Sequence, residues 1–212
     1  MFVVAHRLAF NSTGSKDKSL SIVRLETRRA EILGKMQRFR DQGETLCRAA
    51  DYLRIFGNLQ EAEGYFLRAR KIAEAHGFFS VECKSCLGLG KLAMLLEGRQ
   101  EEGVDLLRNA LVCVPLCEEE VNTMELNVLQ TFTDALFCTH AIGEVEPLVA
   151  RYLEAAKKES ERHGSLRFWD VHSLYTSARL HEVLCTCPLR WEPPHIARSL
   201  HVTKADSASH RY

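Results

Sequence analysis

The 212-residue sequence lacks any apolar run near the ~18 residues that suggest a membrane-spanning helix. We therefore expect no membrane segment. Net charge is also lacking, because 28 basic and 28 acidic residues cancel, which gives no general argument for nucleic-acid binding. Proline is scarce: three of the five prolines lie after Cys187. There Pro193-Pro194 cannot continue a helix, which predicts an irregular tail over 188–212.

Complete nucleotide-binding and catalytic motifs are lacking as well. Gly90-Lys91 has the look of a P-loop, but that motif requires glycine at position 85 and a hydroxyl side chain at position 92, where Ser85 and Leu92 stand. A dinucleotide fingerprint would need an apolar strand before Gly88, and none is visible. No G-x-S-x-G motif or defensible Ser/His/Asp set occurs. The sequence predicts no catalytic residues and no cofactor, so we expect a protein that is not an enzyme.

A secretory signal is not visible, because the opening residues have neither a long apolar core nor a clear cleavage site. We therefore expect a cytoplasmic, or at least intracellular, protein with reduced and mostly buried thiols. The first 20 residues are Ser-rich with Asp17 as their single acid, which leaves organellar targeting open. We interpret residues 1–18 as a flexible N-terminus. The eight cysteines are Cys47, Cys83, Cys86, Cys113, Cys117, Cys138, Cys185 and Cys187.

The pair Cys83-x-x-Cys86 is the sharpest chemical motif. A zinc site would need a second pair, and Cys185-x-Cys187 has the wrong spacing and lies about 100 residues away. A thioredoxin-type site would need a strand before the motif. His172 and His181 could join Cys185 and Cys187 around a metal, but they follow no fixed ligand pattern. We predict buried core thiols and no metal site.

Charge is distributed unevenly along the chain. Residues 1–40 carry nine Lys/Arg and three Asp/Glu, whereas residues 100–150 carry ten Asp/Glu and one basic residue, Arg108. An acidic surface attracts basic partners and speeds their encounter. The pattern favours a basic protein partner, with an ordinary solvated surface as the simpler explanation.

Two internal segments, 55–77 and 96–111, align at an offset of 41 residues. Their small and bulky residues recur at intervals of three and four, which is typical of one face of a helix. Gly57-Asn58 and Gly98 are predicted to form turns between paired helices. A third copy is predicted from Gly143, at an offset of 45. The matching second-helix positions are Ala62, Phe66 and Ala69; Gly103, Leu107 and Ala110; and Leu148, Tyr152 and Ala155.

Gly88 and Gly90 are interpreted as small residues on the first helix of the second copy, where they let helices approach closely. The amphipathic segment 19–42 is predicted to be a leading helix or cap. Each helix pair alone buries too little surface, so stacking of pairs is needed to build a core. First-helix positions in the four copies are Leu46, Ala49, Ala50 and Leu53; Leu87, Gly90, Lys91 and Met94; a third, poorly matched set beginning near Phe132; and Leu174, Ser177, Ala178 and His181.

This pattern, bulky-x-x-small-small-x-x-bulky, then glycine, then small-x-x-x-aromatic-x-x-Ala, resembles the tetratricopeptide repeat family over residues 43–187. The repeat of about 40 residues is similar to the long variant in kinesin light chains and some signalling adaptors. The resemblance implies an all-α fold, an α-solenoid of stacked antiparallel helix pairs forming a superhelix. It also implies a concave groove lined by first helices. The implied groove positions are Glu44, Cys47, Arg48 and Asp51; Ser85, Gly88, Leu89 and Leu92; Gln130, Thr133, Asp134 and Phe137; and His172, Tyr175, Thr176 and Arg179.

The function expected from this resemblance is a scaffold or adaptor that binds a peptide or helix of a partner protein, docked on Leu89, Leu92 and Phe137. The groove lacks the Lys/Asn/Arg set by which some family members hold a C-terminal carboxylate. Ordinary packing between repeats is the simpler explanation for these residues. Two other possibilities stay open: a redox- or metal-responsive thiol protein, and one part of a larger repeat subunit.

Overall fold

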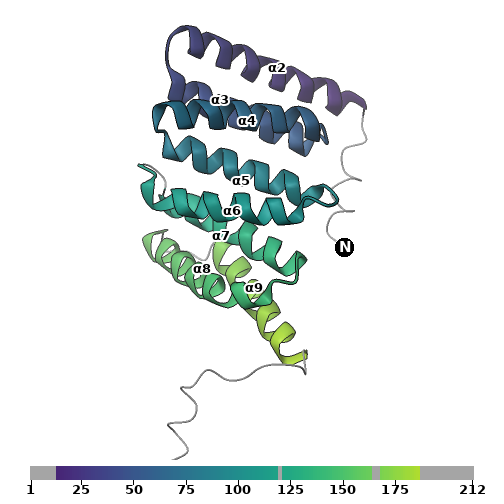
Figure 1. Ribbon diagram of the computed structural model, residues 1–212, viewed down its shortest axis with the longest axis vertical. Helices are drawn as coiled ribbons and strands as arrows, with labels where there is room; N and C mark the ends of the chain where they lie inside the picture. Colours follow the sequence, from purple (N-terminus) through teal and green to yellow (C-terminus); the bar gives the residue numbers. More distant parts are fainter. Residues whose placement is uncertain (1–12, 119–120, 164–167, 187–212) are drawn as a thin grey trace, which may run out of the picture.

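The computed structural model describes residues 13–118, 121–163 and 168–186. All regular structure in these ranges is helical, which confirms the all-α expectation (Figure 1). None of the helices described combines the length and the apolar character needed to cross a bilayer. The elements are α2 (Thr13–Lys35), α3 (Phe39–Ile55), α4 (Leu59–His76), α5 (Phe79–Leu95), α6 (Gln100–Cys113), the 3₁₀ helix η1 (Val114–Leu116), α7 (Val121–Cys138), α8 (Ile142–His163) and α9 (Phe168–Thr186).

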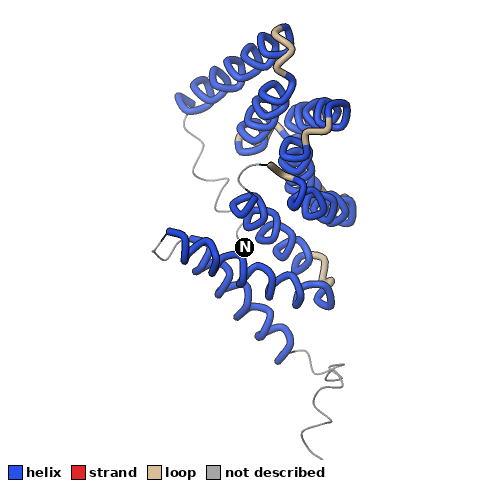
Figure 2. Tube along the Cα trace, turned by 90° about the vertical axis from the view of Figure 1, so that its left-hand side faces the viewer, coloured by secondary structure: helices blue, strands red, loops and turns tan. Residues whose placement is uncertain are grey.

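Each α-helix packs against the next α-helix along the chain. Figure 1 shows the helices following one another down the molecule from α2 to α9, and Figure 2 shows the loops that join them from a second side. Alternate helices also meet, since α3 contacts α5, α5 contacts α7, and α7 contacts α9. These odd-numbered helices, which carry the predicted groove, therefore form a continuous row.

Short turns with one left-handed residue separate most of the helices. Gly57, Gly77 and Gly98 have φ of 84°, 71° and 78°, a region that glycine enters without steric cost. In the turn between α3 and α4, the Asn58 amide donates to the Leu53 carbonyl at 2.9 Å. This is the bond expected of a Schellman cap. The turns predicted at Gly57 and Gly98 are confirmed.

The third copy is out of register with the prediction, because its turn is made by His140 and not by Gly143. His140 has φ of 57°, whereas Gly143 lies inside α8. Counted from the turn residue, the second-helix positions become Val145, Val149 and Tyr152, which are 0%, 3% and 0% exposed. The offset from the second copy is therefore 42 residues. A non-glycine residue in the turn concealed it.

The segment 19–42, predicted as one leading helix or cap, contains a helix boundary. Helix α2 ends at Lys35 and α3 begins at Phe39, with Gln37 at φ of 59° between them. Residues 13–18, predicted to be flexible, belong to α2. The rest of that segment, 1–12, and the predicted tail 188–212 lie outside the described residues.

Glycines inside the helices do allow close packing, as predicted. A Cβ atom added at Gly88 on α5 would overlap the ring of Phe66 on α4. A Cβ atom at Gly90 would lie 2.7 Å from Cγ of Leu107 and 3.2 Å from the carbonyl oxygen of Gly103, both on α6. Helix α5 thus presents one glycine to the helix before it and another to the helix after it.

Candidate binding surface

Helix α3 contributes charged groups that are partly engaged with neighbouring residues. The Arg48 guanidinium lies 3.4 Å from a carboxylate oxygen of Glu26 and its side chain is 43% exposed. Asp51 accepts hydrogen bonds from Arg54 at 3.1 and 3.2 Å. Cys47, predicted to line the groove, is 4% exposed. Arg48, Asp51 and the partly exposed Glu44 are therefore the accessible members of the predicted groove on this helix.

Helix α5 does not supply the apolar floor that the sequence predicted. Leu89 and Leu92 are 4% and 2% exposed and belong to the core shared by α2 to α5. Ser85 and Gly88 are also buried. The reason is that α5 is packed by α3, α4, α6 and α7, so its residues are already occupied by the chain itself. A peptide cannot dock on Leu89 and Leu92 in this conformation.

The repeat positions of α7 are assigned correctly only when the turn after this helix is placed at His140. The equivalent groove positions then become Asn127, Gln130, Thr131 and Asp134, all of which are partly exposed. Gln130 and Asp134 were predicted on the groove, and the corrected register gives them the same positions. The other two predicted residues, Thr133 and Phe137, are 0% and 5% exposed. Because the turn had been placed at Gly143, these two buried residues were wrongly assigned to the surface.

Phe137, Asp134 and Arg179 come together where α7 meets α9. The Arg179 guanidinium lies 4.3 Å from the centroid of the Phe137 ring and 3.8 Å from a carboxylate oxygen of Asp134. Arginine over an aromatic ring is a stabilising arrangement, and here it also covers the ring. The three side chains, together with Tyr175, were predicted as site residues, and we call these four the α7–α9 cluster.

Tyr175 is the most exposed member of the α7–α9 cluster, at 58%. Its ring meets His172 edge-on, with centroids 6.4 Å apart. The Nδ1 atom of His172 lies 3.2 Å from the hydroxyl oxygen of the buried Tyr152 and 3.3 Å from Oγ1 of Thr176. These contacts fix the ring beneath Tyr175, so Tyr175 is presented on a rigid support.

Asp134 presents a partly exposed carboxyl group whose pKa is perturbed by its surroundings. Burial raises the pKa of its carboxyl group, and the nearby His172 and Arg179 act in the opposite direction. The side chain is still 47% exposed. A partner's basic group would compete with Arg179 for this carboxylate, while an acidic group could bind Arg179 itself.

Lys91 is a surface candidate that the repeat pattern concealed, because a small residue was expected there. It lies on α5 near Asp51 and Arg54 of α3. Burial lowers the pKa of its ammonium group, Arg54 lowers it further, and Asp51 raises it. Lys91 thus extends the charged part of the row from α3 to α5.

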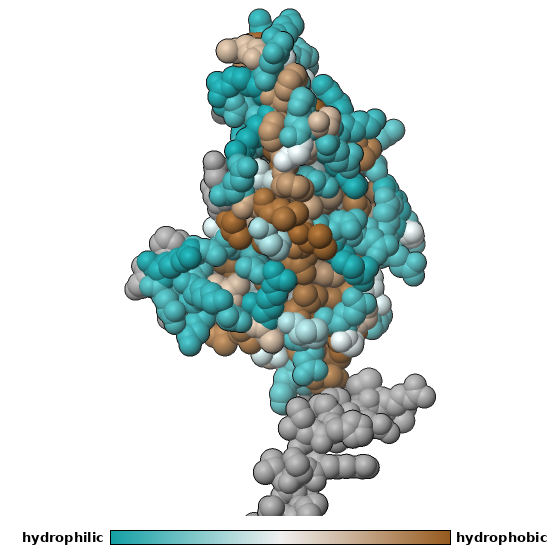
Figure 3. All heavy atoms as spheres, turned by 60° about the vertical axis from the view of Figure 1, so that its left-hand side comes forward, coloured by the Kyte–Doolittle hydropathy of each residue, from teal (hydrophilic) through white to brown (hydrophobic). Residues whose placement is uncertain are grey.

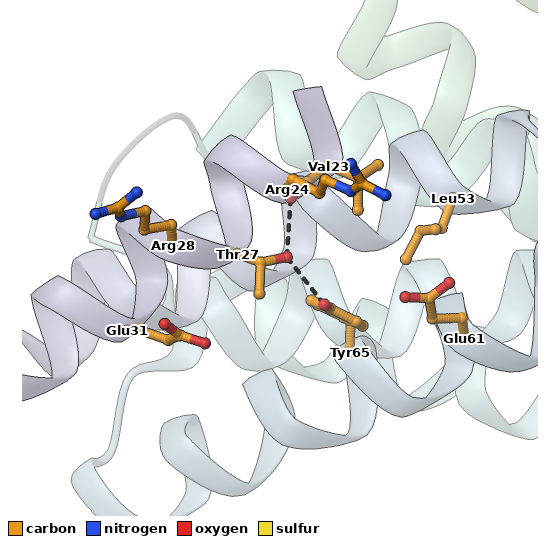
Figure 4. A pocket seen from close by; sticks show the side chains of 8 residues that line it. All are labelled: Val23, Arg24, Thr27, Arg28, Glu31, Leu53, Glu61 and Tyr65. Atoms are coloured by element: carbon orange, nitrogen blue, oxygen red, sulfur yellow. Dashed lines mark hydrogen bonds between the residues drawn. The ribbon is translucent and has the colours of Figure 1, made fainter. Parts of the chain in front are cut away.

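A separate open cavity of about 450 Å³ lies between α2, α3 and α4. Figure 4 shows Thr27 and Tyr65 in its lining, joined by a hydrogen bond of 2.9 Å between their hydroxyl oxygens. Thr27 itself donates to the Val23 carbonyl at 2.8 Å. Two arginines and two glutamates balance its charge, so no ligand class is favoured. The lining residues are Val23, Arg24, Thr27, Arg28, Glu31, Leu53, Glu61 and Tyr65.

Four cysteines gather at the junction of α5, α6 and η1, a grouping that sequence spacing did not predict. Cys83 and Cys86 come from α5, and Cys113 and Cys117 from the end of α6 and its connection to α7. The Cys83 thiol donates to the Ala110 carbonyl at 3.3 Å, and the Cys117 thiol donates to the Cys113 carbonyl at 3.4 Å. All four are buried, and burial raises each pKa, to about 12 for Cys113.

Raised pKa values favour the protonated thiols, which are poor nucleophiles at neutral pH. Within the residues described, no group of three or more His, Cys, Asp or Glu side chains could hold a metal ion. The side chains of Cys185 and Cys187 lie outside that set, so the metal grouping considered with His172 and His181 stays untested.

Apolar side chains also reach the surface of this molecule. Figure 3 shows them as a band running down the middle of one face, between polar margins. A contiguous exposed apolar surface is typical of an interaction site. Among the more exposed apolar residues are Leu25, Met36, Ile55, Leu95, Val112, Val171, Leu174 and Tyr175.

Comparison with protein-family models finds none that matches the chain, and a search of curated proteins finds no match either.

Proposed function

We propose that the protein is a non-enzymatic helical scaffold, an α-solenoid similar to long tetratricopeptide repeats, that binds a segment of a partner protein along its first helices α3, α5, α7 and α9. The observation that carries this proposal is the α7–α9 cluster. It combines an exposed aromatic ring on a rigid support with one acidic and one basic group. Aromatic and arginine side chains dominate binding energy at protein interfaces.

The contact made by the partner differs from the apolar docking expected from the sequence. Because Leu89 and Leu92 are buried, the accessible row is polar, with Tyr175 as its apolar anchor. Asp51 and Asp134 favour a basic partner, and Arg48 and Arg179 provide positions for acids. We expect the bound segment to carry alternating charge around one large apolar residue.

A thiol-based function is the alternative, favoured by the gathering of Cys83, Cys86, Cys113 and Cys117. Their burial and raised pKa values disfavour it. Titration with a thiol reagent and measurement of bound zinc separate the two proposals. Slow reaction of the thiols and no bound zinc support the scaffold. Rapid reaction of the thiols in the folded state, or stoichiometric zinc, supports the alternative.

The scaffold proposal is tested by selecting peptides from a random display library with the folded chain as bait. Enriched peptides are then titrated by calorimetry against the variants Arg48→Glu, Asp134→Lys and Tyr175→Ala. Charge reversals at exposed positions of second helices, Lys71→Glu on α4 and Glu101→Lys on α6, serve as matched controls.

We expect Tyr175→Ala to weaken binding by about tenfold or more, as loss of an interface anchor does. Both charge reversals on the first helices should also weaken binding, and the two controls should not. If no peptide is enriched, or if the controls weaken binding as much as the first-helix variants, the proposal is wrong.

A further inference from the structure

Helix α9 exposes a face that the other first helices bury. In α7, Leu126 and Leu129 are fully buried in a cluster with Tyr152, Ala155 and Ala156 of α8. The sequence pattern of α9 places Val171 and Leu174 at the equivalent positions, 45 residues later, yet they are 66% and 61% exposed. Among the described residues, no helix lies on this face of α9.

The small residues of the pattern show what kind of element belongs there. On α5, Gly90 faces Leu107 and Gly103 of α6, and Ser177 occupies the corresponding position of the α9 pattern. Ala178, next to it, is exposed. The α9 face therefore has the form of a first helix that receives an antiparallel second helix, with Val171, Leu174 and Tyr175 available as apolar contacts.

Helix α2, at the other end of the molecule, lacks a first helix on one of its sides. It buries Val23, Ala30 and Leu33 on one side, and α3 is the only first helix among the described elements that it packs against. The second helices α4 and α6 each contact a first helix on both sides. The free side of α2 carries an apolar stripe at helical spacing, namely Ile22, Leu25 and Ile32, which are 40%, 68% and 50% exposed, and Met36 continues it just past the end of the helix at 60%.

We propose that copies of this chain associate head to tail, with α2 of one copy packing on the α9 face of the next copy. The two surfaces are complementary, because one lacks a second helix and the other lacks a first helix. Charge is compatible with the same pairing, because α2 carries six basic and three acidic residues, whereas α9 carries one basic and two acidic residues. Opposite charges at opposite ends attract end to end.

A head-to-tail contact uses two different surfaces of each copy. Such heterologous interfaces produce open chains or closed rings in place of two-fold dimers. Each junction would restore a helix pair and extend the row of first helices from one copy into the next. The contact leaves the α7–α9 cluster's Asp134 and Arg179 outside the pairing, so it is independent of the peptide-binding proposal except at Tyr175.

The test uses sedimentation velocity of the full chain over a wide range of concentration. Leu174→Glu blocks the α9 face and leaves α2 intact, while Leu25→Glu does the reverse. Leu67→Glu, on an exposed leucine of α4 that is 43% exposed, is the control. Because all three leucines are exposed, each variant should keep the wild-type circular dichroism and melting temperature.

We expect the wild type and Leu67→Glu to form concentration-dependent oligomers that weaken at high salt. Each end variant alone should associate at least about tenfold more weakly. Mixed together, they should form a one-to-one pair through their remaining intact ends.

Three results would overturn the proposal. A wild type that stays monomeric means that another protein or another segment of the chain covers these faces. Oligomers unchanged by either end variant place the contact elsewhere. Loss of association in only one end variant, with no pair in the mixture, indicates a two-fold contact between identical faces.

Discussion

Replacing Gly88 by alanine probes the close packing of α4 against α5 that the fold requires. A Cβ atom at this position overlaps the ring of Phe66, which is 0% exposed. Gly64 offers a matched control, because it lies on the exposed side of α4 and a Cβ atom there meets nothing within 4 Å.

The two substitutions should change stability in opposite directions. Alanine in place of glycine inside a helix favours the folded state by about 1 kcal/mol. Gly64→Ala gains this whole amount. At Gly88 the same gain is opposed by overpacking, which costs about 1–3 kcal/mol in a dense core. The expected net result is a loss of about 1 kcal/mol.

Urea unfolding followed by circular dichroism measures both effects. A second substitution, Phe66→Leu, shortens the side chain that meets the new methyl group. In the double variant, Gly88→Ala should cost less than it does alone, because neighbouring residues are not additive. If Gly88→Ala stabilises the protein as much as Gly64→Ala does, close helix packing at Gly88 is refuted.

Three further predictions concern the turn and the thiols. His140→Gly should raise the free energy of unfolding by about 1 kcal/mol, because glycine adopts positive φ without the steric cost that a side chain adds. Urea unfolding measures this change, and no gain in stability would place the turn elsewhere. A thiol reagent should modify the exposed Cys138 first among the six described cysteines, as peptide mapping by mass spectrometry will show, and early modification of Cys83 would contradict its burial. Burial raises the pKa of Cys47 from 9.0 to about 12, so the folded state holds this proton more tightly and stability should fall as pH rises between these values. Cys47→Ala should flatten that fall in urea unfolding measured across the same pH range, and an unchanged slope would assign it to other groups.

Much of the fold follows from local sequence patterns. Gly57 and Gly98 mark turns because glycine readily adopts positive φ, and the spacing of Ala62, Phe66 and Ala69 identifies a buried face. The third turn was misplaced because His140 adopts the same conformation without being glycine. Histidine at this position carries no local signal for positive φ comparable to that of glycine.

The binding surface was predicted less well, because exposure depends on what covers a helix. Leu89 and Leu92 occupy positions that could line a groove, yet four neighbouring helices enclose α5. All four residues of the α7–α9 cluster were named from the repeat pattern, but Phe137 was expected to be accessible and is 5% exposed. The gathering of Cys83 with Cys117 needed the structure, because the two residues are far apart in sequence.

The most direct test of the proposed binding surface is photo-crosslinking of a selected peptide to the wild-type chain, followed by mass spectrometry of the linked fragments. A photoreactive group at the peptide's apolar anchor should label α7 and α9 around Tyr175, and groups nearer its ends should label α3. Labelling confined to the second helices α4, α6 and α8 would contradict the account.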